Sequence, residues 1–411
     1  RDEMQEQSDR AWEALCAGGS QRDRLEQAAR ADAEIAAGRY RGLLHGIPYG
    51  AKDLLSVPGY PTTWGAEPYR AQMLEETATV IRRLEDAGAV LVAKLSLGAL
   101  AWGDVWFGGT TRNPWDLQQG SSGSSAGSAA ATAAGLVAFA IGTETWGSIV
   151  SPSTRCGVTG LRPTFGRVSR HGAMALAWSM DKIGPICRGV EDCAIVFDAI
   201  RGADGLDPTA VDRPFSYDAG IDLRRLRIGY LEEEFGRDYP SRAPDSLALE
   251  RLRAMRFDLV PISLPRYPVY PLAIILSAEA AAAFDELTRS GRDDLMVRQV
   301  RNAWPNVLRS ARFIPAVEYV QANRIRTLIM REMEGLEVDI YAAPSFGENL
   351  LVTNLTGHPC VVVPNGFDDE GRPVSITFTG KLFDEGLLLA FARAYQEETG
   401  FHRRHPPLFV E

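Results

Sequence analysis

Segments with helical spacing that lead directly into strand-like segments constrain the fold of this chain most strongly. Residues 76–87 have the apolar spacing of a helix, end before Gly88 and continue into the apolar run 89–93. A helix of small residues is predicted over 129–134, and a strand over 137–142 follows it. This repeated order of helix and strand is typical of α/β proteins.

The same order continues along the chain without an internal repeat or a low-complexity linker. We therefore expect one α/β domain over 41–411, with a large twisted mixed β-sheet as its core and helices on both faces. Residues 1–40 are predicted to form an N-terminal helical segment that packs on this core. The further predicted elements are helices over 190–200, 272–290 and 385–397 and strands over 46–53, 226–231, 338–344, 360–364 and 374–379.

Composition and charge narrow the functional classes. The formal charge of -9 is spread along the 411 residues without a basic run, so nucleic-acid binding is not expected. No apolar stretch is long enough for a membrane span. The cysteines and histidines lack metal-ligand spacing, so we expect no metal and no cofactor. A cytoplasmic location is expected, and secretion remains open because a targeting peptide could have been removed before Arg1.

Two loops rich in glycine and serine, over 102–128 and 143–166, are where the backbone is expected to approach a ligand. The run 123–163 resembles the defining Gly/Ser-rich stretch of the amidase signature family. Further family motifs follow in order, so the resemblance covers roughly residues 40–400 and a chance match is excluded. They lie at 46–48 with Lys52, 59–63, 166–169, 180–185 and 354–359. The resemblance implies the amidase signature fold and hydrolysis of amide-type bonds.

Carried over by position, the catalytic triad of the family corresponds to Lys52, Ser124 and Ser148. Ser124 takes the place of the serine that the family holds in a cis peptide. A serine hydroxyl is a poor nucleophile until a base takes its proton, and lysine is a base only when it is neutral. We therefore expect Lys52 to be buried and partly neutral, Ser148 to be the nucleophile, and Ser124 to relay the proton between them.

The resemblance also implies an oxyanion hole made by the backbone N–H groups of Thr145, Trp146, Gly147 and Ser148. Three features depart from the family pattern. Trp146 stands where the family usually has glycine, and Val150 stands where many members have an arginine that can hold a carboxylate. The interval 344–354 is short for a segment that commonly helps to form the wall of the substrate site.

Aromatic residues cluster near these loops and favour an apolar or aryl substrate. Trp102 and Trp106 are four positions apart, which is one turn if that stretch is helical. The predicted substrate is a small neutral amide, carbamate or ester, and the chain is expected to act as a monomer or homodimer. The residues predicted to line the pocket are Trp102, Trp106, Ser125, Trp146, Val150 and Trp178.

Three alternatives compete with this amidohydrolase. Ser125 lies in a G-x-S-x-G string, but the polar loop 115–122 before it is not the strand that a nucleophile elbow needs. An amidotransferase subunit that releases ammonia for an acyl group bound to transfer RNA would need partner proteins and glutamine recognition. A non-catalytic amide-binding scaffold is disfavoured because Lys52, Ser124 and Ser148 are all present.

Overall fold

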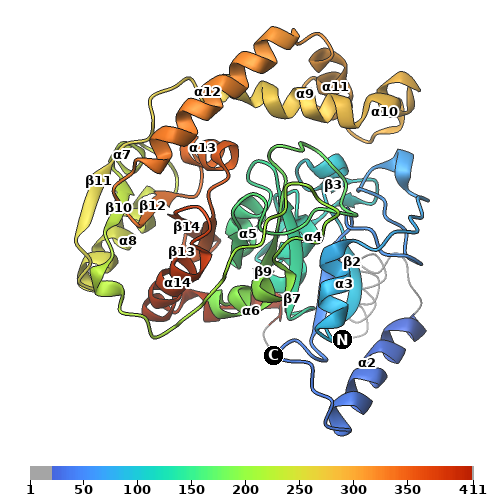
Figure 1. Cartoon of the computed structure of the whole chain (residues 1–411), viewed down its shortest axis with the longest axis horizontal. Helices are drawn as coiled ribbons and strands as arrows, with labels where there is room; N and C mark the ends of the chain where they lie inside the picture. Colours follow the sequence, from blue (N-terminus) through green and yellow to red (C-terminus); the bar gives the residue numbers. More distant parts are fainter. Residues whose placement is uncertain (1–20, 410–411) are drawn as a thin grey trace.

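The computed structural model describes residues 21–409, and within them ten strands form one mixed β-sheet (Figure 1). The order across the sheet is β11-β10-β12-β14-β13-β8-β9-β7-β1-β2, with two short hairpins, β3 with β4 and β5 with β6, outside it. The strands of the sheet are β1 Pro48–Lys52, β2 Val90–Leu95, β7 Phe139–Glu144, β8 Thr159–Arg162, β9 Lys182–Cys187, β10 Ile228–Leu231, β11 Leu259–Ile262, β12 Ile340–Pro344, β13 Cys360–Phe367 and β14 Pro373–Gly380. The hairpin strands are β3 Val105–Trp106, β4 Gly109–Thr110, β5 Arg112–Asn113 and β6 Asp116–Gly120.

Helices cover both faces of the sheet, which confirms the expected fold class. On one face lie α3 Thr79–Asp86, α6 Val190–Ile200, α8 Arg242–Ala254 and α14 Glu385–Thr399, and on the other lie α4 Ala126–Ala133 and α5 Val150–Cys156. Because side chains alternate along a strand, Phe139 of β7 joins the core with Phe197 of α6, while Ala140 packs with Ala131 of α4.

The strands β1 and β7 are neighbours and run parallel, with Ala51 opposite Ile141. Their carboxyl ends therefore lie at the same edge of the sheet, and this register places Lys52 beside the Gly142–Thr143 step. Ligands of α/β sheets bind at the carboxyl ends of parallel strands, so this edge is where a site is expected.

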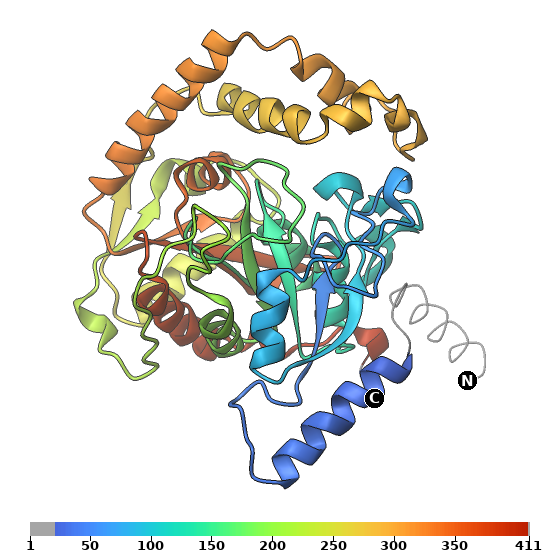
Figure 2. The ribbon, with the colours of Figure 1, turned by 45° about the vertical axis from the view of Figure 1, so that its right-hand side comes forward.

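Four helices form an arch over one side of the body (Figures 1 and 2). They are α9 Ile274–Ala283, α10 Asp285–Arg289, α11 Trp304–Ala311 and α12 Ala316–Glu334, and α12 returns to contact α13 Glu348–Thr356. The remaining helices are α2 Gln21–Ala36 and α7 Glu232–Gly236. The helix α2 contacts β2, while the first twenty residues of the predicted N-terminal segment lie outside the described range.

Two predicted elements were wrong. The segment 143–166 is not a continuous loop, because it contains α5 and β8. Pro152 lies in the first turn of α5, where a helix needs no backbone N–H donor, so proline does not prevent the helix. The single helix predicted over 272–290 is divided at Phe284, whose buried ring turns onto Trp64 with 6.1 Å between ring centroids.

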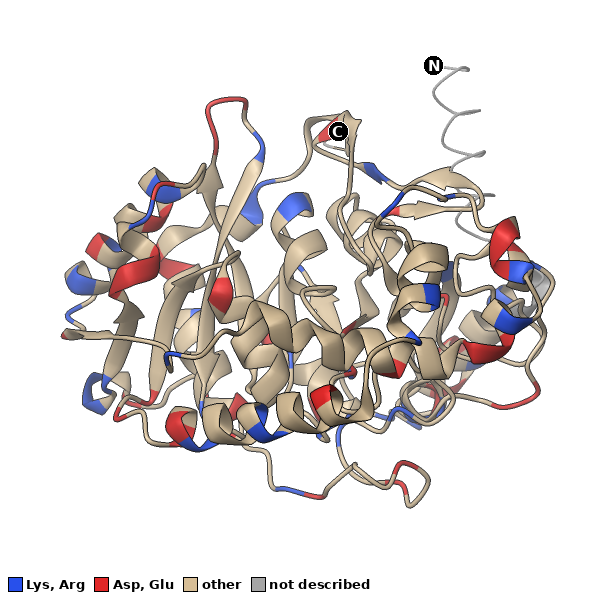
Figure 3. Ribbon diagram, turned by 90° about the horizontal axis from the view of Figure 1, so that it is seen from above, with Lys and Arg blue, Asp and Glu red and all other residues tan. Residues whose placement is uncertain are grey.

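Charged residues of both signs alternate along the ribbon of the described chain (Figure 3). Lysine and arginine are spread over many elements of the described chain, in keeping with the formal charge of -9. Within residues 21–409, none of the helices combines the length and the apolar character that a membrane crossing needs.

Candidate active site

Lys52 is the last residue of β1, and its side chain is completely buried. Its amine Nζ lies 2.8 Å from Ser124 Oγ and 3.0 Å from Ser125 Oγ. It also donates to Thr143, whose Oγ1 is 2.8 Å away and whose carbonyl oxygen is 3.3 Å away. The amine is thus surrounded by hydroxyl and carbonyl oxygens, and no carboxylate of the described residues contacts it.

The environment of Lys52 favours its neutral form. Burial lowers the pKa of Lys52 well below its usual value, because a charged amine is penalised away from water, and the more distant carboxylates of Asp181 and Glu144 only partly oppose the shift. A neutral amine keeps a lone pair that can accept the proton of the Ser124 hydroxyl. The structure has Lys52 buried, as expected from the sequence.

Ser124 and Ser125 immediately precede α4, which packs on β1 and β7 and so holds both serines against the end of β1. The peptide bond between Gly123 and Ser124 is cis. Gly123 passes so close to Gly103 that a Cβ on it would overlap the Gly103 carbonyl oxygen, and only glycine fits there.

Ser148 lies in the turn between β7 and α5, with only 8% of its surface exposed. The backbone N–H of Ser125 donates to the Ser148 carbonyl oxygen at 3.1 Å, which joins the two serine loops. The hydroxyls of Ser148 and Ser124 make no hydrogen bond to each other within the described chain. The Ser148 hydroxyl is therefore not held by Ser124 in this structure.

The turn that carries Ser148 presents unpaired backbone donors. In residues 21–409 none of the N–H groups from Thr145 to Ser148 donates to another residue. Gly147 has φ +89°, a left-handed conformation that other residues rarely adopt. Free N–H groups beside a serine hydroxyl are the arrangement that stabilises an oxyanion.

Glu144 holds the backbone that directly follows the Thr145–Ser148 turn. Its buried carboxylate accepts from the N–H groups of Ile149 at 2.7 Å and Val150 at 2.9 Å, and pairs with Arg162 Nη1 at 2.7 Å. Burial alone would raise the pKa of Glu144, but Arg162 and these donors lower it, so the group is an anion. Asn354 Nδ2 is a further donor at 2.8 Å. The backbone after Ser148 is therefore held by a paired charge.

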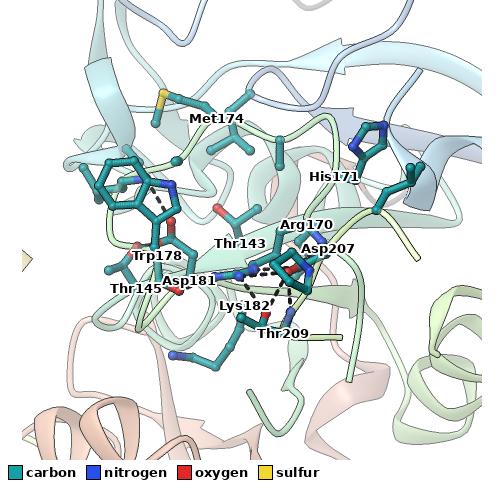
Figure 4. A pocket seen from close by; sticks show the side chains of 18 residues that line it. Thr143, Thr145, Arg170, His171, Met174, Trp178, Asp181, Lys182, Asp207 and Thr209 are labelled. Carbon is teal, nitrogen blue, oxygen red and sulfur yellow. Dashed lines mark hydrogen bonds and ion pairs between the residues drawn. The ribbon is translucent and has the colours of Figure 1, made fainter. Parts of the chain in front are cut away.

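Asp181 holds the other end of the turn. The Thr145 hydroxyl donates to Asp181 Oδ1 at 2.6 Å (Figure 4). The N–H groups of Leu176 and Ala177 donate to Oδ2. Glu144 and Asp181 thus position the Thr145–Ser148 turn from both sides. Neither role was predicted from the sequence, nor was that of Thr143, although Asp181 lies in the quoted motif and Glu144 follows an apolar strand.

A cavity of about 310 Å³ opens beside Thr143 and Thr145. Its wall is largely apolar and includes Leu54, Met174 and Trp178, and the Arg170–Asp207 ion pair lies at its rim (Figure 4). Of the residues predicted to line the substrate pocket, Trp178 lines this cavity, and its contact with a substrate stays a prediction. No group of three or more potential metal ligands occurs in the part of the chain that is described.

Other predicted pocket residues lie elsewhere. Val150 begins α5 and is buried against Cys360 and Val362, so it does not line the cavity. Ser125 is turned towards Lys52 and Thr143 instead of a pocket wall. Trp146 is 38% exposed.

Trp102 and Trp106 do not share a helix. Trp102 follows a short 3-10 turn and packs edge-on against Trp304 at 5.0 Å, whereas Trp106 is in β3 and packs against Phe107. Neither borders the cavity beside Thr145. Their spacing of four residues suggested one face of a helix, because the sequence does not indicate that the chain turns between them.

Comparisons with known proteins identify the family of the chain. The family model described as Amidase matches residues 17–351. The matching glutamyl-tRNA(Gln) amidotransferase subunit of Roseiflexus sp. (strain RS-1) is 38% identical over 437 residues, covering 94% of this chain and 89% of that protein. That span exceeds the 411 residues of this chain, so the relative contains residues without a counterpart here.

Two solved structures share the fold. The peptide amidase from Stenotrophomonas maltophilia has a TM-score of 0.81 and 31% identity, covering 95% of this chain and 89% of its own. The corresponding glutamyl-tRNA(Gln) amidotransferase subunit from Thermotoga maritima has a TM-score of 0.75 and 27% identity, covering 92% of each chain. With the family match and these relatives, the chain belongs to the amidase signature family, whose members cleave carbon–nitrogen bonds.

Proposed function

We propose that this chain cleaves a carbon–nitrogen bond of its substrate through an acyl-enzyme on Ser148, with Lys52 as the base and Ser124 as the proton relay. The observation that carries the proposal is the buried Lys52 amine, 2.8 Å from Ser124 Oγ, beside a turn with free N–H groups. No carboxylate or imidazole contacts the amine in the described chain, so hydroxyl groups are its only acidic partners.

The reaction follows from these positions. Ser148 Oγ attacks the carbonyl carbon while its proton passes to Ser124 and the proton of Ser124 passes to Lys52 Nζ. The carbonyl oxygen becomes an anion and accepts hydrogen bonds from the Thr145–Ser148 turn. Lys52 then returns a proton through Ser124 to the departing nitrogen, and water releases the acid by the reverse path. Because the hydroxyls of Ser124 and Ser148 are not bonded to each other, the relay requires one of them to rotate when the substrate binds.

The curated relatives favour a role as the ammonia-releasing subunit of an amidotransferase. Relatives described as glutamyl-tRNA(Gln) amidotransferase subunits are 35% to 39% identical over most of this chain. In that role Ser148 would accept the acyl group of glutamine, and the ammonia released would pass to an acceptor bound by a partner protein. This role, an alternative on sequence grounds, has more support from the curated relatives than the neutral-amide hydrolase, and it requires protein partners.

A free-standing amidase is the second candidate, and three observations favour it. The peptide amidase structure matches with a TM-score of 0.81, above the 0.75 of the amidotransferase subunit. Where many family members have an arginine that can hold a carboxylate, this chain has the buried Val150. The connection between β12 and α13 is also short, with only residues 345–347. A site without that arginine suits a neutral amide better than the carboxylate of free glutamine.

One assay separates the two roles. The purified chain is given glutamine, a C-terminally amidated dipeptide and an aryl amide, and release of ammonia or amine is measured for the wild type and for Ser148→Ala. Glutamine turnover together with a co-purifying partner supports the amidotransferase role, and turnover of the neutral amides by the chain alone supports the amidase. If Ser148→Ala keeps the wild-type rate, the acyl-enzyme proposal is wrong. A cytoplasmic location is proposed with either role and can be tested by cell fractionation.

A further inference from the structure

A second hollow adjoins the cavity at the active site. It has a volume of about 700 Å³ and lies between the body and the arch, with α9 and α12 on one side and the segment around Trp178 on the other. Trp178 and Thr209 border both spaces, so the two hollows are neighbours on either side of these residues. The indole of Trp178 is 49% exposed, although it lies next to buried residues. A ligand that reaches past Trp178 therefore enters the second hollow.

The lining of this second hollow is mainly apolar, with one cation that is not neutralised by direct contact. Phe165, Ala278, Ala282 and Met330 provide apolar surface. Arg326 donates through Nε to the Leu355 carbonyl oxygen and through Nη2 to the Ser179 carbonyl oxygen at 2.6 Å. Its Nη1 has no hydrogen-bond partner among the described residues, and no carboxylate there lies within ion-pair distance.

The one acidic group in the hollow is already engaged. Glu279 Oε1 accepts from Tyr319 at 2.9 Å and from the Ser179 hydroxyl at 2.7 Å, and Oε2 accepts from the Ser179 N–H. These bonds tie α9 and α12 to the segment that carries Trp178. The hollow is therefore built by fixed contacts, and the Nη1 group of Arg326 gives it a charged donor without a partner among the described residues. An apolar space with such a donor fits an aryl or alkyl group that carries a carbonyl acceptor.

We propose that the hollow between the arch and Trp178 is a distal substrate subsite, which binds an aryl group bearing a carbonyl oxygen and lets Arg326 donate to that oxygen. The subsite rests on the proposed function, because it extends the substrate away from the bond that Ser148 attacks. It assigns the arch a role in selecting long amides over short ones.

The test compares three kinds of ligand on the Ser148→Ala protein by titration calorimetry. N-benzoylglycinamide and N-(2-benzamidoethyl)acetamide place a benzamide on the acyl side and on the amine side of the scissile bond, and acetamide has none. At least one benzamide is expected to bind tenfold or more tightly than acetamide. 4-Phenylbutanamide, which keeps the ring and lacks the internal carbonyl, is expected to bind several-fold more weakly than N-benzoylglycinamide if the acyl side enters the hollow.

A filled hollow provides the decisive variant. Ala282 is exposed on α9 and lines the space, so Ala282→Trp fills it without disturbing the core. The matched control is Ala254→Trp, at an exposed position of α8 away from the hollow. Ala282→Trp is expected to remove the tenfold preference for the benzamide and to leave acetamide binding unchanged, and Ala254→Trp to change neither.

Two results would overturn the subsite: neither benzamide binds more tightly than acetamide, or Ala282→Trp leaves the preference intact. Turnover by the wild-type chain is measured separately. If a benzamide binds but no amide is turned over, the subsite stands and the acyl-enzyme is rejected. If amides are turned over and Ala282→Trp changes neither binding nor turnover, the acyl-enzyme stands and the subsite is rejected.

Discussion

The Lys52 amine lies 2.8 Å from the Ser124 hydroxyl oxygen, although 72 residues separate them along the chain. The contact exists because β1 ends at Lys52 and α4, which follows Ser124, packs on β1 and its neighbour β7. Burial lowers the pKa of the amine and so favours its neutral form, and proximity to a hydroxyl gives it a proton to accept. This contact determines how the rate should respond to substitution and to pH.

Removing either partner of this contact is expected to lower the rate without unfolding the protein. Lys52→Met and Ser124→Ala should each reduce kcat/KM by about 10²- to 10⁴-fold, since each removes a step of general acid–base catalysis. The measurement is amide turnover, with circular dichroism to verify folding. His358→Ala is the control, because the His358 ring bonds to Thr356 and reaches none of the three proposed catalytic groups. Equal loss in all three variants would argue against a specific relay.

The rate is expected to rise with pH. Lys52 can accept a proton only when it is neutral, so below its pKa the fraction of active enzyme falls tenfold for each pH unit. Burial lowers the pKa of Lys52, which moves the start of the active range to a pH below the usual value for lysine. The profile of kcat/KM against pH should therefore show an acidic limb of unit slope that levels off above the pKa of Lys52. A profile that stays flat into acid pH would exclude lysine as the base.

Gly147→Ala should impair catalysis more than stability. A Cβ at Gly147 lies 3.0 Å from Leu350 Cδ2, and φ +89° is strained for alanine, so the turn that supplies the N–H donors must move. We expect kcat to fall about 10²- to 10³-fold, which is the cost of losing an oxyanion donor. Gly205→Ala is the matched control, because Gly205 has φ +76° with open space around it. Similar kcat values for the two variants would show that the turn is not an oxyanion hole.

Arg162→Met should destabilise the fold strongly. Arg162 and Glu144 are both fully buried and pair at 2.7 Å, so loss of the arginine leaves an unpaired buried carboxylate. The free energy of unfolding, measured with urea, is expected to fall by about 3–5 kcal/mol. The double variant Arg162→Met/Glu144→Gln should recover part of this loss, since it has no buried charge. A double variant no more stable than the single one would contradict this account of the pair.

The parts of the site that depend on local sequence could be predicted. The run before Lys52 is short, apolar and punctuated by glycine and proline, so a strand ending at Lys52 followed from pattern alone. The serine loops were found through motifs that need no knowledge of packing.

What could not be predicted depends on contacts between distant segments. Val150 was placed in the pocket because its position in the motif does not show that α5 turns it into the core. The role of Glu144 requires Arg162 and Asn354 to converge on it, and no spacing rule encodes that. In the helix α12 the buried Ala322, Ile329 and Met333 lie at helical spacing, but exposed apolar residues such as Val320 and Leu328 lie near them in the sequence, so the periodicity was not recognised.

The central claim is that Ser148 carries the acyl group. The most direct measurement is to treat the chain with a fluorophosphonate, digest it, and locate the adduct by mass spectrometry, with Ser148→Ala in parallel. The account predicts one adduct per chain, on the peptide containing Ser148, and none in Ser148→Ala. An adduct on Ser125, which the rival G-x-S-x-G motif would make the nucleophile, or turnover of an amide without any adduct on Ser148, would contradict it.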